Sequence, residues 1–113
     1  MYTKERILEI NNMIEDAIKA VIRVRRLDED GNIYSNPTDI YNKASSLVQD
    51  AIDVFEEFYD DAYELYSYSI FINEMTMNYN FMLDLCELDA SVNEYTRDRW
   101  LNKTPKTIND IDI

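Results

Sequence analysis

The chain has 113 residues, with 23 acidic and 11 basic side chains, one cysteine and no histidine. This length suits one domain, and the 46% of apolar residues can form a core despite a net charge of −12. The lack of histidine excludes serine–histidine and cysteine–histidine catalysis and histidine-containing metal sites. The first residues are charged, and no apolar run is long enough to span a membrane. We therefore expect a small cytoplasmic domain without cofactor or metal.

The negative charge is concentrated in the middle of the chain. All basic residues lie within positions 4–43 or 97–106, and the segment 44–96 contains twelve acids and no base. This segment therefore carries the entire net charge, because the other eleven acids are matched by the eleven bases. Solvated surfaces ordinarily mix both signs, so the segregation points to a surface that attracts a basic partner.

The first predicted element is a helix over about 4–26. Apolar residues recur there at helical spacing: Ile7, Ile10, Ile14, Ala17, Val21 and Val24. An alternative stays open at its end. Val21 begins a β-branched stretch, and Asp30-Gly31-Asn32 is typical of a turn, so a short β-hairpin near 21–34 could replace the last helical turns.

A second, two-faced helix is predicted from about Thr38 to Tyr66. One face is apolar and aromatic, and the opposite arc carries six carboxylates: Asp50, Asp53, Glu57, Asp60, Asp61 and Glu64. Beyond Tyr66 the pattern changes phase, because Asn73, Thr76 and Asn80 form a polar stripe where the preceding helix was apolar. This shift predicts a bend at 66–69.

A third helix, over about 70–88, is apolar around most of its circumference, so we expect it to be the central element, with Cys86 buried. A fourth begins at Ser91, where Ser91-Val92-Asn93-Glu94 matches a capping box, and ends near Asn102. The overall prediction is an all-α domain over 1–104, either a four-helix bundle-like or an orthogonal arrangement. A flexible or extended tail at 105–113 follows it.

The six carboxylates of the second helix are the main candidate site. They span about 21 Å of helix, and one DNA strand presents a phosphate about every 3.4 Å, so about six phosphates match them in charge density. Tyr63, Tyr66 and Tyr68 lie beside them and offer contact area and cation–π contacts to arginine. The alternative is a solvated acidic face, with most of these rings in the core.

These features predict a non-catalytic binding protein that acts by occlusion. In size, charge and helix-plus-tyrosine surface, the chain resembles the acidic nucleic-acid mimics that phages and mobile elements use against restriction, CRISPR or repair proteins. That group shares no common motif. The resemblance implies a basic nucleic-acid-binding protein or nucleoprotein complex as the partner. A net charge this negative predicts no direct binding to nucleic acid or membrane.

Two alternatives come from other classes. In the first, the apolar seam of the first helix pairs across a homodimer, and the chain is a structural or regulatory bundle. In the second, Glu56-Glu57-Phe58-Tyr59-Asp60 resembles the E-E-x-x-E/D element of all-α nucleoside triphosphate pyrophosphatases of the MazG type. That resemblance implies Mg²⁺ held by these acids and by a second acidic element. The segment Asp84-Leu85-Cys86-Glu87 is similar to that element, in the order D-x-x-E where the family has E-x-x-D.

Overall fold

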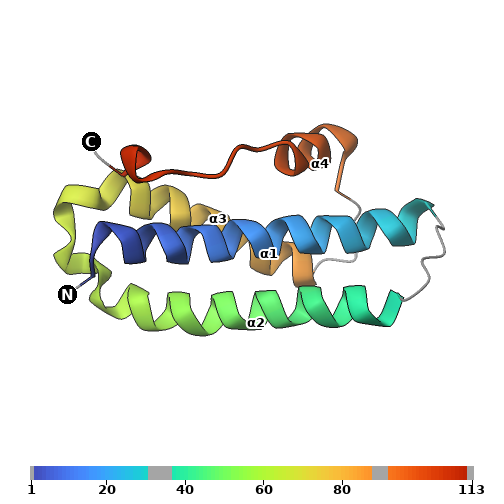
Figure 1. The fold of residues 1–113 in the computed structure, drawn as a ribbon, viewed down its shortest axis with the longest axis horizontal. Coiled ribbons are helices and arrows are strands. Elements are labelled where there is room, and N and C mark those ends of the chain that lie inside the picture. The colour runs from blue at the N-terminus through green and yellow to red at the C-terminus, as the bar shows by residue number, and fades with distance from the viewer. Residues whose placement is uncertain (1, 31–36, 88–91, 112–113) are drawn as a thin grey trace.

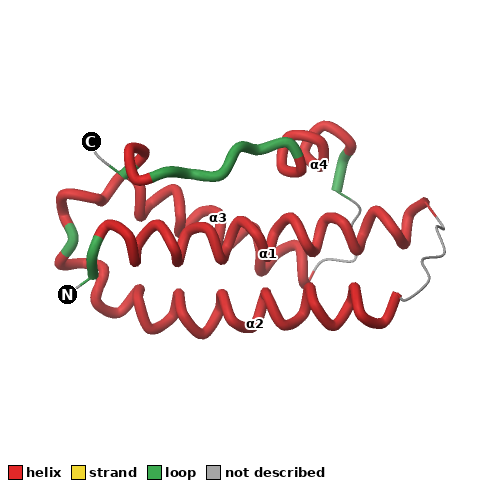
Figure 2. The backbone as a smooth tube through the Cα atoms, in the orientation of Figure 1, coloured by secondary structure: helices red, strands yellow, loops and turns green. Residues whose placement is uncertain are grey.

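The computed structural model describes residues 2–30, 37–87 and 92–111. Over these residues the chain forms four α-helices and no strand (Figures 1 and 2). The helices are α1 (Lys4–Asp30), α2 (Pro37–Asp61), α3 (Ser69–Glu87) and α4 (Glu94–Leu101), with 3₁₀ turns at Ala62–Glu64, Tyr66–Tyr68 and Ile108–Asp110. The predicted all-α, four-helix domain is confirmed.

The central element is α1. It runs along the length of the molecule beside α2, with α3 passing behind it and α4 on the side away from α2 (Figure 1). It contacts every other described helix, whereas α2 and α3 meet at few points. Five of its isoleucines are at most 1% exposed: Ile7, Ile10, Ile14, Ile18 and Ile22. Burial of these side chains from water is the main force that holds the other helices on α1.

The prediction that the third helix is central is wrong. Ile70 and Met77 on α3 are 64% and 71% exposed, and Cys86, expected to be buried, is exposed. The buried side of α3 includes Phe71, Met75 and the other residues that face α1. A helix that is apolar around its whole circumference can be buried on every side, but each side is buried only where another segment packs against it.

The hairpin alternative near 21–34 is not adopted in the described residues. The helix α1 continues to Asp30, and positions 31–34 lie outside the described residues. Ile18 and Ile22 are four positions apart and both buried, so the helical spacing of buried residues continues into the stretch where the hairpin was the alternative.

Two 3₁₀ turns connect α2 to α3, and the chain turns earlier than predicted. The second helix ends at Asp61 and not near Tyr66, and the turns are closed by the backbone bonds Leu65 N to Ala62 O (2.9 Å) and Tyr68 N to Leu65 O (3.1 Å). Ala62 is buried, whereas Tyr66 is 80% exposed. Extending α2 would therefore have carried the chain past the core that Phe71 and Met75 must reach.

The fourth helix is capped by Asn93. Its side-chain oxygen accepts a hydrogen bond from Thr96 N at 2.8 Å, as in a standard N-cap. The predicted helix start at Ser91 is corrected to Glu94, and Ser91 itself lies outside the described residues. Trp100 stacks on Phe81 of α3, with ring centroids 5.7 Å apart, which attaches α4 to the body of the domain.

The segment after α4 runs back along the helices toward the end of the molecule that holds the N-terminus (Figure 2). Lys103 forms an ion pair with the buried Glu15 of α1, and Lys106 Nζ lies 3.3 Å from Glu74 Oε1 of α3. Glu15 also accepts a hydrogen bond of 2.7 Å from Asn11 Nδ2. At the end of this segment Ile111 is 0% exposed and belongs to the same core as α1.

We predict that Ile111→Ala lowers the free energy of unfolding by about 2–4 kcal/mol, because it removes a fully buried side chain and leaves a cavity. Ile70→Ala is the matched control: its side chain is mostly exposed, so its loss should cost less than about 1 kcal/mol. Urea denaturation followed by circular dichroism measures both. Equal effects of the two substitutions would show that residues up to 111 are not part of the cooperative core.

Candidate functional site

All six predicted carboxylates are exposed in the structure. Five of them, from Asp50 to Asp61, lie on α2, and Glu64 lies on the 3₁₀ turn Ala62–Glu64. We call this set the acidic stripe. From Asp50 to Asp61 the helix rises about 16 Å, so five carboxylates still match one phosphate about every 3.4 Å.

The stripe places acids where a helix favours them least. Along α2, Asp50, Asp53, Glu57 and Asp60 follow one another at intervals of three or four positions, where like charges repel. Asp60 and Asp61 lie in the last turn, which contains no base, although the helix dipole favours cations there. Gln49 Nε2 donates to Asp53 Oδ1 at 2.9 Å. That bond orients one carboxylate without neutralising its charge.

Tyr2 borders the stripe on one side. Its ring packs edge-on against the buried Phe58, with centroids 4.8 Å apart. Burial raises the pKa of the Tyr2 hydroxyl, and the nearby charges of Asp61 and Glu57 raise it further, while Arg6 acts in the opposite direction. The sequence pattern did not identify Tyr2, because it precedes the first helix and has no place in that helix's periodicity.

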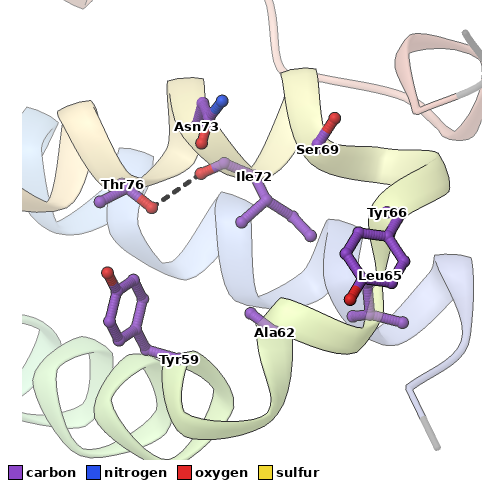
Figure 3. A pocket seen from close by; sticks show the side chains of 8 residues that line it. All are labelled: Tyr59, Ala62, Leu65, Tyr66, Ser69, Ile72, Asn73 and Thr76. Carbon is purple, nitrogen blue, oxygen red and sulfur yellow. Dashed lines mark hydrogen bonds between the residues drawn. The ribbon is translucent and has the colours of Figure 1, made fainter.

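A hollow of about 430 Å³ lies on the other side, between α2 and α3 (Figure 3). Figure 3 shows Tyr59 reaching from α2 toward α3 and Tyr66 at the opposite end, with Ala62 and Ile72 between them and Leu65 beside Tyr66. Its remaining lining residues are polar and come from α3: Ser69, Asn73 and Thr76. The hydroxyl of Thr76 donates to the Ile72 carbonyl at 2.8 Å, so the helix backbone satisfies it.

A second hollow of about 490 Å³ adjoins the first, and Tyr59 and Thr76 line both. It adds two acids from α2, Glu56 and Asp60, and Asn80 from α3. We call the two hollows together the α2–α3 groove. Asp60 belongs both to this groove and to the acidic stripe, so the two features form one continuous surface.

The groove follows from how the helices pack. Both α2 and α3 pack on α1 and have few contacts with each other, which leaves a gap above their shared core. The polar stripe predicted for the third helix lines this gap, through Asn73, Thr76 and Asn80. That change of phase was the available sequence signal for the groove, but periodicity alone does not tell which neighbour a polar stripe faces.

The three predicted tyrosines and the neighbouring Tyr59 occupy different environments. Tyr66 projects at the end of the groove and is mostly exposed, and Tyr59, 56% exposed, forms a groove wall. Tyr68 is half-buried, with Lys4 Nζ 6.0 Å from its ring centroid. The side chain of Tyr63 lies outside the described part of the chain. The acidic stripe and Tyr66 thus lie on adjoining surfaces, while Tyr68 faces the start of α1.

Tyr79 forms part of the floor of the groove. It is buried and stacks on Phe55, with ring centroids 4.1 Å apart. Burial raises the pKa of its hydroxyl, and the charge of Glu56 and a hydrogen bond with that side chain raise it further. The neutral phenol therefore links the base of the groove to an acid at its rim.

Within residues 2–30, 37–87 and 92–111, no group of three or more acidic or cysteine side chains is arranged to hold a metal ion. None of the described helices is both long enough and apolar enough to pass through a membrane. No protein-family model, curated protein or solved structure matches the chain. The interpretation of this surface therefore rests on its geometry and charge.

We predict that Tyr79→Phe makes stability less sensitive to alkaline pH. The folded pKa of Tyr79 lies above its unfolded value, so its contribution is complete below about pH 10 and is lost as pH rises through the folded pKa. At neutral pH the free energy of unfolding of the variant should be about 1 kcal/mol lower than that of the wild type, because the hydrogen bond is lost. As pH rises above about 10, the free energy of unfolding should fall less in the variant than in the wild type.

Urea unfolding across this pH range measures the effect, and Tyr66→Phe, at an exposed position, is the control that should follow the wild type. Parallel curves for the wild type and Tyr79→Phe would contradict the assignment.

Proposed function

We propose that the protein is a non-catalytic inhibitor that presents the acidic stripe as a mimic of a nucleic-acid backbone. In this role it occludes the basic cleft of a nucleic-acid-binding protein or nucleoprotein complex, in the manner of anti-restriction or anti-CRISPR proteins. The observation that carries the proposal is the row of exposed carboxylates on α2, spaced like phosphates, within a segment that contains no base.

The energetic cost of the stripe supports a binding role. Each acid in the last turn of α2 opposes the helix dipole by about 0.3–1 kcal/mol, and each like-charge pair at helical spacing costs about 0.2–0.5 kcal/mol. One lysine among these positions would relieve part of that cost, and none is present. A cationic cleft would relieve the same repulsion on binding, so relief of this repulsion would contribute to the binding free energy.

The bases at the C-terminal end support the proposal in a second way. Lys103 pairs with Glu15 and Lys106 with Glu74, so these cations are engaged with acids of α1 and α3. Neither of these two lysines compensates the stripe on α2. Long-range attraction between such a stripe and a basic cleft accelerates encounter and weakens as salt screens it.

The test uses two variants with equal change in net charge. The stripe variant carries Asp50→Asn, Glu57→Gln, Asp60→Asn and Glu64→Gln. The control variant carries Asp16→Asn, Asp84→Asn, Glu87→Gln and Asp98→Asn, all at exposed positions outside the stripe. A partner is captured from a cell lysate with the wild type and purified, and its affinity for each variant is measured by calorimetry.

We expect the stripe variant to bind at least about tenfold more weakly and the control to stay within about threefold. Wild-type affinity should fall steeply as salt is raised, and duplex DNA or RNA should compete for the partner. Equal affinities of the two variants, affinity independent of salt, or binding of the partner to nucleic acid and to this protein at the same time would each overturn the proposal.

A further inference from the structure

The α2–α3 groove has a shape that backbone mimicry alone does not require. A row of carboxylates on a helix is enough to replace phosphates, yet beside it lies a hollow whose base is apolar, formed by Ala62, Leu65 and Ile72. Tyr59 and Tyr66 stand at its two ends with much of their rings in solvent. Partly exposed aromatic rings around an apolar hollow are typical of protein-binding sites.

The charge at the rim limits what fits there. Among the described residues, Glu56 and Asp60 are the charged ones that line the groove. The polar side chains that α3 contributes are neutral and include Ser69, Asn73, Thr76 and Asn80. In the part of the chain that the structure describes, no lysine or arginine lines either hollow. The complement of an apolar hollow with an acidic rim is an apolar side chain with basic neighbours.

We propose that the α2–α3 groove receives an apolar side chain, such as leucine or an aromatic residue, from a basic amphipathic segment of the target protein. The arginines or lysines next to it in that segment contact Asp60 and Glu56. This inference rests on the proposed function and specifies its partner. The target is recognised by an apolar anchor inserted beside the charge contacts, and a surface that is merely cationic binds more weakly.

The molecule contains its own contrasting site. A hollow of about 530 Å³ between α3, α4 and the following segment is also bordered by aromatic rings, including Tyr95 and Trp100, but Arg99, Lys103 and Lys106 line it. Glu74 is the acid in the described lining of this hollow, so three bases stand against one acid and a basic segment is less favoured there than in the α2–α3 groove. Tyr95 is 75% exposed. Its replacement by alanine is therefore a matched control for the same replacement at Tyr66, in a hollow that is lined mainly by bases.

The probes are two synthetic peptides with the same length and the same number of arginines. One is amphipathic, with leucines on one helical face, and in the other serines replace the leucines. Calorimetry with the full-length protein gives the affinities at low salt and at about 1 M salt, where the Debye length is about 3 Å. We expect the leucine peptide to bind about tenfold more tightly, because an apolar side chain leaves water, and to keep measurable affinity at high salt.

Two variants remove the anchor site by different means: Tyr66→Ala removes one end wall, and Asn73→Trp fills the hollow from an exposed position on α3. Each should abolish the preference for the leucine peptide, whereas Tyr95→Ala should keep it. Circular dichroism confirms that each variant is folded.

The outcomes separate this inference from the proposed function. Equal binding of the two peptides to the wild type, or an unchanged preference in both groove variants, overturns the anchor site. If in that case binding still depends on the acidic stripe, the charge mimicry stands without the groove. Loss of the preference in both groove variants, together with its retention in Tyr95→Ala, supports the site.

Discussion

Burial of the α1 isoleucines is the interaction on which the rest of the structure depends. Because α1 is buried on several sides, α2, α3 and the segment after α4 each pack on it. This arrangement keeps α2 and α3 from closing on one another and leaves the α2–α3 groove open between them. It also turns the acidic face of α2 outward, since the opposite face holds Phe55 and Phe58 in the core. The packing of α2 and α3 on α1 thus accounts for both the core and the exposed surface of α2.

The charges divide in the same way. Lys103 contacts Glu15 inside the molecule, where the lysine compensates a buried carboxylate, and leaving that carboxylate unpaired would be strongly unfavourable. The acidic stripe has no base in its own segment of the chain, so no neighbour within that segment offsets the repulsion between its carboxylates. Lys103 and Lys106 thus pair with acids of α1 and α3. In the proposed function, an external partner supplies the cations that face the stripe on α2. On this view the groove adds selectivity, because electrostatic attraction alone distinguishes partners poorly.

Much of the fold was predictable because helical periodicity is a local property. The spacing of Ile7, Ile10 and Ile14 predicted α1, and the phase change after Tyr66 predicted that the chain turns before α3. The errors have one physical cause: periodicity describes which side of a helix is apolar and does not show how many neighbours will cover it. Ile70 and Met77 of α3 are therefore exposed to solvent. In the same way, α2 ends at Asp61 although the apolar pattern continues beyond it. The exposure of the carboxylates could be predicted, but Tyr2 and Tyr79 could not be placed, since distant segments bring them to the site.

The sequence by itself determined the all-α class, the arc of carboxylates on one helix and the separation of a basic-free segment from a balanced remainder, because each depends on residue type and spacing along the chain. Only the tertiary structure decided that α1 is central, that the polar stripe of α3 faces α2, and that Lys103 and Ile111 return to the core. These depend on how the helices share a limited apolar surface. That competition involves residues far apart in sequence, and no local pattern encodes its outcome.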